Sequence, residues 1–379
     1  MNKKELGIYV HIPFCKQKCY YCDFISFANK ECEQEAYIKA LKKEIDIYDF
    51  KNYNVTTIYF GGGTPSYLDS KYIVEIMKKL KSKLNNLEDI EITIEVNPGT
   101  VTKQKLMDYK KIGINRISIG LQTTNNKLLK QIGRIHTYEE FLKTYELAKE
   151  VGFTNINVDL MLGLPNQTIE DLKESLETVI KLDASHISVY SLIVEEGTPI
   201  SKLLDDGKLK LPDEELERQM YWYVKNTLEL NGYKHYEISN FAKENKESRH
   251  NMNCWNQEEY IGFGVAAHSY LNNVRYSNTA NLKSYIQNIE KAYFEKNKNI
   301  EEVQDIKMSQ NEFMMLGLRK IDGVDISKFK EKYVQNPIFL YKDKLNKLVN
   351  EGLIEVTLNN IRLTNKGLDL ANLVFEEFV

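Results

Sequence analysis

The sequence has no long apolar run and no apolar leader, and these absences exclude membrane-spanning and secreted classes of protein. No stretch approaches the ~20 apolar residues that a transmembrane helix needs. The N-terminus, Met-Asn-Lys-Lys-Glu, leads directly into a strand-like segment without a signal-peptide pattern. We therefore expect a cytoplasmic protein.

The sequence also lacks an excess of either charge, because 51 Lys and Arg residues balance 54 Asp and Glu residues, for a formal net charge of -3. Such a chain has no long-range field that would attract nucleic acid or anionic lipid. With 42% hydrophobic and 28% charged residues among 379, its composition is that of an ordinary globular protein. The length predicts two or three domains, and no nucleic-acid partner is expected.

Cysteines are few, and their spacing excludes a disulfide framework. Three of the five crowd into Cys15-Lys-Gln-Lys-Cys19-Tyr-Tyr-Cys22, while Cys32 and Cys254 stand apart, which fits a reducing compartment. The spacing C-x3-C-x2-C lets three thiols reach three irons of a four-iron cluster and leaves one iron open. A zinc loop is the alternative, although a zinc site usually has a second pair of ligands, which does not follow here. The trio therefore predicts a cluster that binds a small molecule.

Short runs of β-branched and aromatic residues alternate with amphipathic helical stretches over the first 200 residues. The six predicted strands are Leu6–Ile12, Val55–Phe60, Ile90–Val96, Arg116–Leu121, Thr154–Leu162 and His186–Ile193. Ser70 and Thr168 are placed to cap the helices after the second and fifth strands. This alternation predicts a parallel sheet with right-handed crossovers, either as a closed barrel, an open sheet or a partial barrel.

The pattern changes at about Leu211, after which the sequence predicts a long helix over Pro212–Leu230. The last seventy-odd residues read as helices followed by a hairpin, a combination that resembles a winged helix. A DNA-binding regulator with a redox cluster is therefore one hypothesis. From Asp305 onward, however, 11 Lys and Arg balance 11 Asp and Glu, so the basic footprint of a DNA-binding module is missing. We expect three parts, covering residues 1–230, 231–304 and 305–379.

Polar residues recur at the predicted carboxyl ends of strands, where the sites of parallel α/β folds gather. The segment Gly61–Thr64 follows the second strand, and its glycines would let backbone groups approach a ligand closely. Glu95 lies in an apolar strand, where a carboxylate needs hydrogen bonds from a ligand or an ion-pair partner. Gln122 and Asp159 follow the same logic, and Arg134 is suited to pairing with the carboxylate of an amino-acid ligand.

The cysteine spacing, with Tyr9-Val-His-Ile-Pro-Phe-Cys15 before it, resembles that of the radical S-adenosylmethionine (SAM) enzymes. The later segments Gly-Gly-Gly-Thr-Pro-Ser, Ile-Glu-Val-Asn-Pro, Ser-Ile-Gly-Leu-Gln and Asp-Leu-Met-Leu-Gly-Leu-Pro resemble oxygen-independent coproporphyrinogen III dehydrogenase and its haem-chaperone relatives. The resemblance implies an α/β fold, with a partial (β/α)6 radical SAM barrel and a C-terminal α+β region ending in a winged-helix-like module. It also implies a [4Fe-4S] cluster on Cys15, Cys19 and Cys22, whose open iron binds SAM. By the same resemblance, the residues that line the SAM site are Tyr9, Tyr21, Gly62, Gly63, Thr64, Glu95, Gln122, Arg134 and Asp159.

Two departures from the dehydrogenase pattern favour the HemW-type haem chaperones. The dehydrogenase has a fourth cysteine two positions after the third, where this chain has Phe24, and a longer N-terminal arm. The segment Arg249-His-Asn-Met-Asn-Cys-Trp255 resembles the chaperones' His-Asn-x-x-Tyr-Trp motif, with Cys254 in place of the tyrosine. This resemblance implies haem contact by His250 and Trp255, with Cys254 as an alternative ligand. Without it, both would be expected to be packed core residues.

We therefore expect a haem chaperone that binds haem, a [4Fe-4S] cluster and SAM, and that transfers haem to apoproteins such as respiratory enzymes. No catalytic residue is assigned. The alternative is the dehydrogenase, which converts coproporphyrinogen III to protoporphyrinogen IX. The resemblance leaves open a homodimer and peripheral contact with membrane-associated acceptors.

Overall fold

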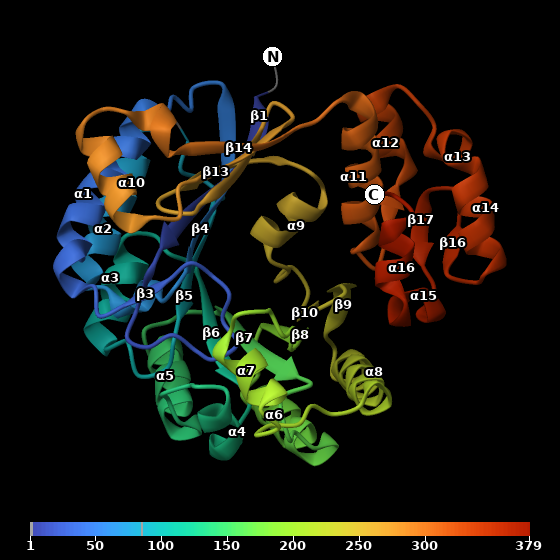
Figure 1. The fold of residues 1–379 in the computed structure, drawn as a ribbon, viewed down its shortest axis with the longest axis horizontal. Helices are drawn as coiled ribbons and strands as arrows, with labels where there is room; N and C mark the ends of the chain where they lie inside the picture. Colours follow the sequence, from blue (N-terminus) through green and yellow to red (C-terminus); the bar gives the residue numbers. More distant parts are fainter. Residues whose placement is uncertain (1–2, 85) are drawn as a thin grey trace.

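A single 12-stranded sheet organises the protein in the computed structural model, which describes residues 3–84 and 86–379 (Figure 1). The strand order is β14-β13-β12-β11-β1-β4-β5-β6-β7-β8-β10-β9. Its centre consists of six adjacent parallel strands: β1 (Lys4–Ile12), β4 (Tyr53–Gly62), β5 (Glu91–Val96), β6 (Arg116–Gln122), β7 (Asn155–Leu162) and β8 (His186–Ser191). All six predicted strands are present, and the partial-barrel fold is confirmed.

The two faces of these strands differ in polarity because side chains alternate between them. One face is apolar and packs against helices, as Ile8 and Val10 of β1 and Ile94 of β5 do. The covering helices are α1 (Gln34–Ile47), α2 (Ser70–Lys81), α3 (Lys103–Lys111), α4 (Asn126–Gln131), α5 (Tyr138–Glu150) and α6 (Ile169–Lys181). The other face carries mainly polar side chains, such as Thr57 and Asn157, and forms the inner wall of the barrel. The alternation of apolar and polar residues along the strands thus gives the barrel a polar interior.

Residues 231–304 extend the sheet at both edges. Strands β9 (Lys234–Glu237) and β10 (Asn240–Ala242) follow β8, while β11 (Glu259–Phe263) pairs with β1 in parallel. Strands β12 (His268–Leu271), β13 (Val274–Asn278) and β14 (Lys298–Val303) continue antiparallel from β11. Helix α9 (Arg249–Trp255) lies between the two edges, near the amino ends of the barrel strands (Figure 1).

Shorter elements complete this part of the chain. Strands β2 (Phe14–Cys15) and β3 (Phe27–Ala28) enclose the cysteine loop. The remaining elements are η1 (Glu31–Glu33), η2 (Pro65–Tyr67), α7 (Pro199–Asp205), α8 (Glu214–Leu230), α10 (Leu282–Glu290) and η3 (Phe294–Asn297).

The C-terminal region is a separate α+β module with its own apolar core around Phe313, Phe329 and Ile361. Its helices are α11 (Ile306–Leu318), α12 (Ile326–Tyr333), α13 (Pro337–Leu340), α14 (Lys342–Asn350), α15 (Asn365–Asp369) and α16 (Ala371–Glu376). Strands β15 (Val324–Asp325), β17 (Asn360–Leu363) and β16 (Ile354–Val356) form a three-stranded sheet that includes the predicted hairpin. The exact three-part division of the chain stays a prediction.

One predicted helix cap is wrong and one is confirmed. Asp69, not Ser70, caps α2, because its side chain accepts the backbone N–H of Lys71 at 2.9 Å. Ser70 is already helical, and its hydroxyl donates to Asp108 instead. Thr168 caps α6 in a reciprocal capping box. Among the helices of the described residues, none is long and apolar enough to cross a membrane.

Candidate functional site

The cysteine loop lies at the carboxyl end of β1 and is held from both sides by backbone hydrogen bonds. Tyr20 donates its N–H to the carbonyl of Ile132 and accepts the N–H of Ile200 on α7, each at 3.0 Å. Cys15 is buried on β2, whereas Cys19 and Cys22 are partly exposed. These contacts fix a loop whose three thiols remain free.

The three sulfurs lie close enough to influence one another's ionisation. Burial, and to a smaller extent a negative charge on Cys19, raises the pKa of Cys22 to about 11. Burial also raises the pKa of Cys15, and Cys19 again adds to the effect. Within the part of the chain that the structure describes, no three His, Cys, Asp or Glu side chains converge tightly enough for a single metal ion. Thiols that bind different irons of a cluster need not converge on one point, so this geometry is compatible with the predicted cluster.

The glycine-rich segment at the carboxyl end of β4 lies directly against Cys15. Gly63 and Thr64 donate their N–H groups to the carbonyls of Ile12 and Phe14, each at 2.9 Å. Gly62 has φ +110, and a Cβ there would lie 2.4 Å from the ring of His11. A Cβ on Gly63 would lie 3.0 Å from the Cys15 sulfur. Glycine is required at Gly62 by both conformation and space, which leaves a backbone-lined cradle beside the cluster loop.

Glu95 is held at the carboxyl end of β5 by two donors. The hydroxyl of Tyr59 donates to Oε1 at 2.9 Å, and the N–H of Gly62 donates to Oε2 at 3.2 Å. Burial raises the pKa of this carboxyl to about 7, and the charge of Asp159 adds to the rise. Tyr9 stacks on Tyr59 with ring centroids 6.2 Å apart. Three of the predicted residues, Tyr9, Gly62 and Glu95, thus form one connected group.

A second chain of hydrogen bonds links Cys15 to Arg134. Thr64 donates its hydroxyl to the Cys15 sulfur at 3.5 Å and accepts Nδ2 of Asn97 at 2.9 Å. Asn97 Oδ1 accepts Nη1 of Arg134 at 2.9 Å, and the guanidinium lies over the ring of Tyr21 at 5.9 Å. This chain of hydrogen bonds places the hydroxyl of Thr64 against Cys15 and connects it through Asn97 to the cation of Arg134.

Two buried polar atoms in this group have no partner within the described residues: Nε of Arg134 and Oε1 of Gln122. Gln122 also has φ +67, in the left-handed region that non-glycine residues rarely adopt. Unpaired donors and acceptors are costly when buried, so their presence suits a ligand that brings both an amino and a carboxylate group. The residues therefore fit the amino-acid end of SAM.

Asp159 completes the predicted set on the inner face of β7. Its carboxylate accepts Nδ2 of Asn157 at 2.7 Å and the hydroxyl of Ser118 at 3.2 Å. Burial raises its pKa, although these donors oppose the rise. All nine residues predicted for the SAM site thus lie toward the carboxyl ends of the barrel strands or in the segments that follow them.

The structure does not bring His250 and Trp255 into one pocket. His250 is 9% exposed, shares a hydrogen bond with Thr57 at 2.8 Å and stacks on Tyr59 with centroids 5.0 Å apart. Trp255 instead faces the C-terminal module, where the guanidinium of Arg319 lies 4.4 Å from its ring centroid. The indole N–H of Trp255 is buried without a partner among the described residues.

Cys254, the alternative haem ligand, is partly exposed, and burial raises its pKa to about 11. A thiol with a raised pKa is a poorer ligand at neutral pH than a thiolate.

Three residues that complete the mouth were not assigned from the sequence: His11, Tyr59 and Asn97. The N–H of His11 Nε2 donates to the carbonyl of Ile25 at 2.9 Å, so Nδ1 accepts the hydroxyl of Tyr9 at 3.0 Å. The alternation of β4 contains a signal for Tyr59, because Tyr59 and Gly61 share the inner face of that strand. No local signal identifies Asn97, whose role depends on contacts with distant segments.

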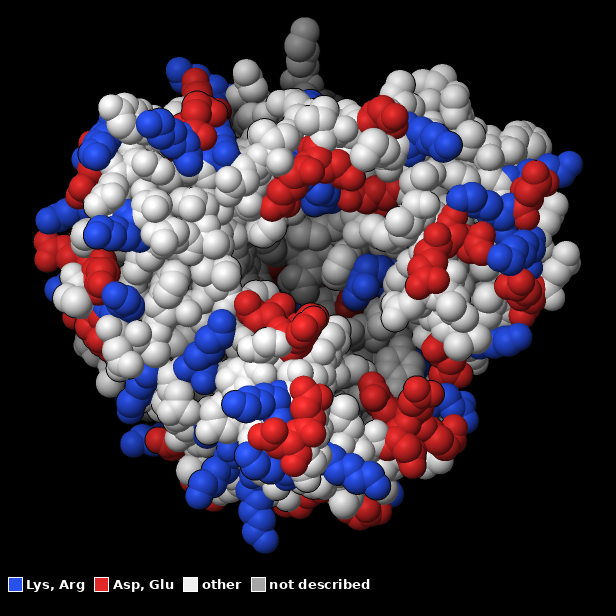
Figure 2. Space-filling model, viewed as in Figure 1, with Lys and Arg blue, Asp and Glu red and all other residues white. Residues whose placement is uncertain are grey.

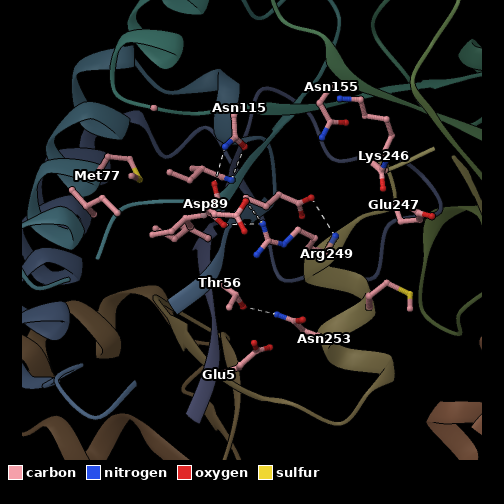
Figure 3. Close-up of a pocket in the computed structure, with 18 of the residues that line it drawn as sticks. Glu5, Thr56, Met77, Asp89, Asn115, Asn155, Lys246, Glu247, Arg249 and Asn253 are labelled. Carbon is pink, nitrogen blue, oxygen red and sulfur yellow. Dashed lines mark hydrogen bonds and ion pairs between the residues drawn. The ribbon is translucent and has the colours of Figure 1, made fainter. Parts of the chain in front are cut away.

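A separate cavity of about 720 Å³ lies at the opposite, amino-terminal ends of the strands (Figure 3). Its polar lining includes Asp89, Glu91, Asn115, Arg249 and Asn253. Helix α9 docks there, because the N–H groups of Arg249 and His250 both donate to the Glu91 carboxylate at 3.2 Å. The visible face of the molecule has both charges intermixed and a hollow at its centre (Figure 2).

Comparison with protein families gives two matches along the chain. Residues 9–179 match the radical SAM superfamily, and residues 310–370 match the HemN C-terminal domain. The first match contains the cysteine loop and the residues predicted for the SAM site.

Among similar curated proteins, the heme chaperone HemW of Bacillus subtilis (strain 168) is 39% identical over 98% of both chains. The heme chaperone HemW of Lactococcus lactis subsp. lactis (strain IL1403) is 38% identical over 100% of this chain and 98% of its own. Among solved structures, the radical SAM enzyme coproporphyrinogen III oxidase (HemN) from Escherichia coli matches with a TM-score of 0.86 and 25% identity. The match covers 99% of this chain and 90% of the enzyme.

Proposed function

The chain belongs to the HemW family of radical SAM proteins, and from this premise we propose that it is a haem chaperone that binds haem, a [4Fe-4S] cluster and SAM and transfers haem to acceptor proteins. The observation that carries the proposal is the similarity to HemW chaperones over nearly the whole of both chains, which includes α9. The exposed Phe24 supports it, because the dehydrogenase pattern has a cysteine at this position.

In the proposal, Cys15, Cys19 and Cys22 hold the cluster, and when bound to them it supplies an electron donor and an open iron for SAM. The backbone of Gly62 and the unpartnered atoms of Gln122 and Arg134 bind the amino-acid end of SAM. The remaining predicted contacts are made by Tyr9, Tyr21, Gly63, Thr64, Glu95 and Asp159. The chain of hydrogen bonds from Cys15 to Arg134 keeps the ligand-binding groups in position before SAM arrives.

Haem is proposed to contact α9 through His250 and Trp255. Because their side chains face different surfaces, simultaneous contact with one haem requires either a shift of α9 or contact from only one of them. The proposed acceptors are apoproteins such as respiratory enzymes, in the cytoplasm or at its membranes. A homodimer is part of the same proposal.

One experiment separates the chaperone from the dehydrogenase. The protein is reconstituted anaerobically with iron and sulfide and supplied with SAM, a reductant and coproporphyrinogen III, and haem binding is titrated in parallel. We expect stable haem binding and no divinyl product. His250→Ala should weaken haem binding without loss of the cluster, whereas His268→Ala, at an exposed site, should change neither. Formation of protoporphyrinogen IX with enzymatic turnover would favour the dehydrogenase, which the likeness to HemN makes the second candidate.

A further inference from the structure

Arg116, the first residue of β6, is buried in the barrel and forms no ion pair with any described residue. It is 2% exposed and lies on the inner face, since the next residue, Ile117, packs in the apolar core. Its Nε has no hydrogen-bond partner, and within residues 3–84 and 86–379 the guanidinium takes part in no ion pair. A buried charge without a partner costs several kcal/mol, so an unpaired arginine in this position calls for a ligand.

A second unpartnered group lies beside it. Thr93 of β5 is directly paired with Arg116 in the strand register, and its side chain is fully buried. Its hydroxyl also has no hydrogen-bond partner among the described residues. Neighbouring strands are about 4.8 Å apart, so the two side chains leave the sheet from adjacent positions on the same interior wall.

Among the described residues, the charge of Arg116 is offset only by Asp159, which interacts with it without forming an ion pair. Burial, and to a smaller extent the positive charge of Arg116, lowers the pKa of His250 to about 4. The pKa of His186 is likewise lowered by burial and by Arg116, which keeps its ring neutral. The positive charge of Arg116 acts to lower the pKa of Asp159, but the carboxylate oxygens of Asp159 accept their hydrogen bonds from Asn157 and Ser118. The surroundings therefore offer two neutral imidazoles and no carboxylate in contact with Arg116.

We propose that Arg116 and Thr93 form a carboxylate-binding site on the interior wall of the barrel. A planar guanidinium binds a carboxylate through two parallel N–H donors, and the neighbouring hydroxyl can donate a third hydrogen bond. The carboxylate comes either from a propionate of haem or from a small free acid. The haem source rests on the proposed function and is supported by His250, whose ring faces the same interior against Tyr59.

The test uses the full chain with its cluster reconstituted, and compares wild type with Arg116→Gln, Thr93→Val and the matched control Arg362→Gln. Arg362 is on the exposed hairpin of the C-terminal module, where it pairs with Glu355. Thermal unfolding is measured in sodium acetate and in sodium chloride of equal ionic strength. Haem and haem dimethyl ester, which has no free carboxylate, are titrated into each variant.

If the site takes a free carboxylate, acetate raises the Tm of wild type and of Arg362→Gln but not of Arg116→Gln. If it takes a haem propionate, wild type prefers haem over its dimethyl ester by roughly tenfold, the effect of one charge-assisted hydrogen-bonded pair. This preference then falls to about one in Arg116→Gln. Thr93→Val keeps the charge and should reduce either response only in part, which gives a readout even if Arg116→Gln folds poorly.

The proposal is overturned if acetate protects no variant selectively and the ratio of haem to ester affinity is the same in wild type and Arg116→Gln. Arg116 would then be a cation solvated by water alone. Failure of wild type to bind haem at all would instead contradict the proposed function. The acetate measurement would still decide whether the carboxylate site exists.

Discussion

Replacing Glu95 by glutamine should make the stability of the ligand-free protein less dependent on pH. Burial raises the pKa of this carboxyl from 4.5 to about 7, so the folded state favours the neutral form. A shift of this size corresponds to about 3 kcal/mol. Because the carboxyl is partly open to solvent at the barrel mouth, we expect about 2 kcal/mol after allowing for solvent screening.

The direction follows from the raised pKa of Glu95. The contribution of the Glu95 carboxyl to the free energy of unfolding is fully present below pH 4.5, where this carboxyl is protonated in both the folded and the unfolded protein. This contribution is lost as the pH rises through about 7. In Glu95→Gln, the amide oxygen can still accept the hydrogen bond from the Tyr59 hydroxyl, but the amide NH2 group faces the N–H of Gly62, which is also a donor. The lost hydrogen bond should destabilise the variant by about 1 kcal/mol at every pH. Relative to wild type, the variant should therefore gain about 2 kcal/mol between pH 4.5 and pH 8.

Urea unfolding at a series of pH values, without cluster or SAM, measures this difference. Asp159 is also buried with a raised pKa, but it is present in both proteins, so most of its titration cancels in the comparison. Parallel stability curves for wild type and variant would show that Glu95 is ionised at little cost. The reasoning from burial would then be refuted.

Three further predictions follow from particular contacts. Cys22→Ser should abolish iron and sulfide uptake, whereas Cys32→Ser, at an exposed cysteine outside the loop, should retain it, as iron analysis can determine. Gly62→Ala should destabilise the protein by about 3 kcal/mol in urea unfolding, because the new Cβ would clash with the ring of His11 and the backbone at this position has a positive φ. An unchanged unfolding midpoint would contradict the close approach of Gly62 to that ring. Thr168→Ala should cost about 1 kcal/mol through loss of the α6 cap, and no change would show that the capping box contributes nothing.

The individual strands and helices could be predicted because the spacing of apolar residues that marks each of them involves only residues close together in the sequence. Strand β6, for example, begins at Arg116 as predicted and extends one residue beyond the expected end. The cap of α2 was misplaced by one residue because Asp69 and Ser70 are both good capping types, and the local sequence does not decide between them. Strands β9–β14 were not predicted to join the barrel sheet, since such pairing depends on distant partners.

For the candidate site, too, the residues that belong to local motifs could be predicted, but the contacts between distant segments could not. The motif residues at the strand ends could be identified along the chain, and the structure places them toward the carboxyl ends of the barrel strands. The links between them could not, because Asn97 connects Thr64 to Arg134 across three segments. The opposed directions of His250 and Trp255 also follow from how α9 docks on Glu91, which the sequence does not reveal.

Transfer of haem to an acceptor tests the central claim most directly. The haem-loaded protein is mixed with a haem-free respiratory apoprotein, and filling of the acceptor is followed by its absorption spectrum as the acceptor concentration is increased. The account predicts a transfer rate that rises with acceptor concentration, as direct handover between two bound proteins requires. A rate that stays constant and equals spontaneous haem release would contradict it.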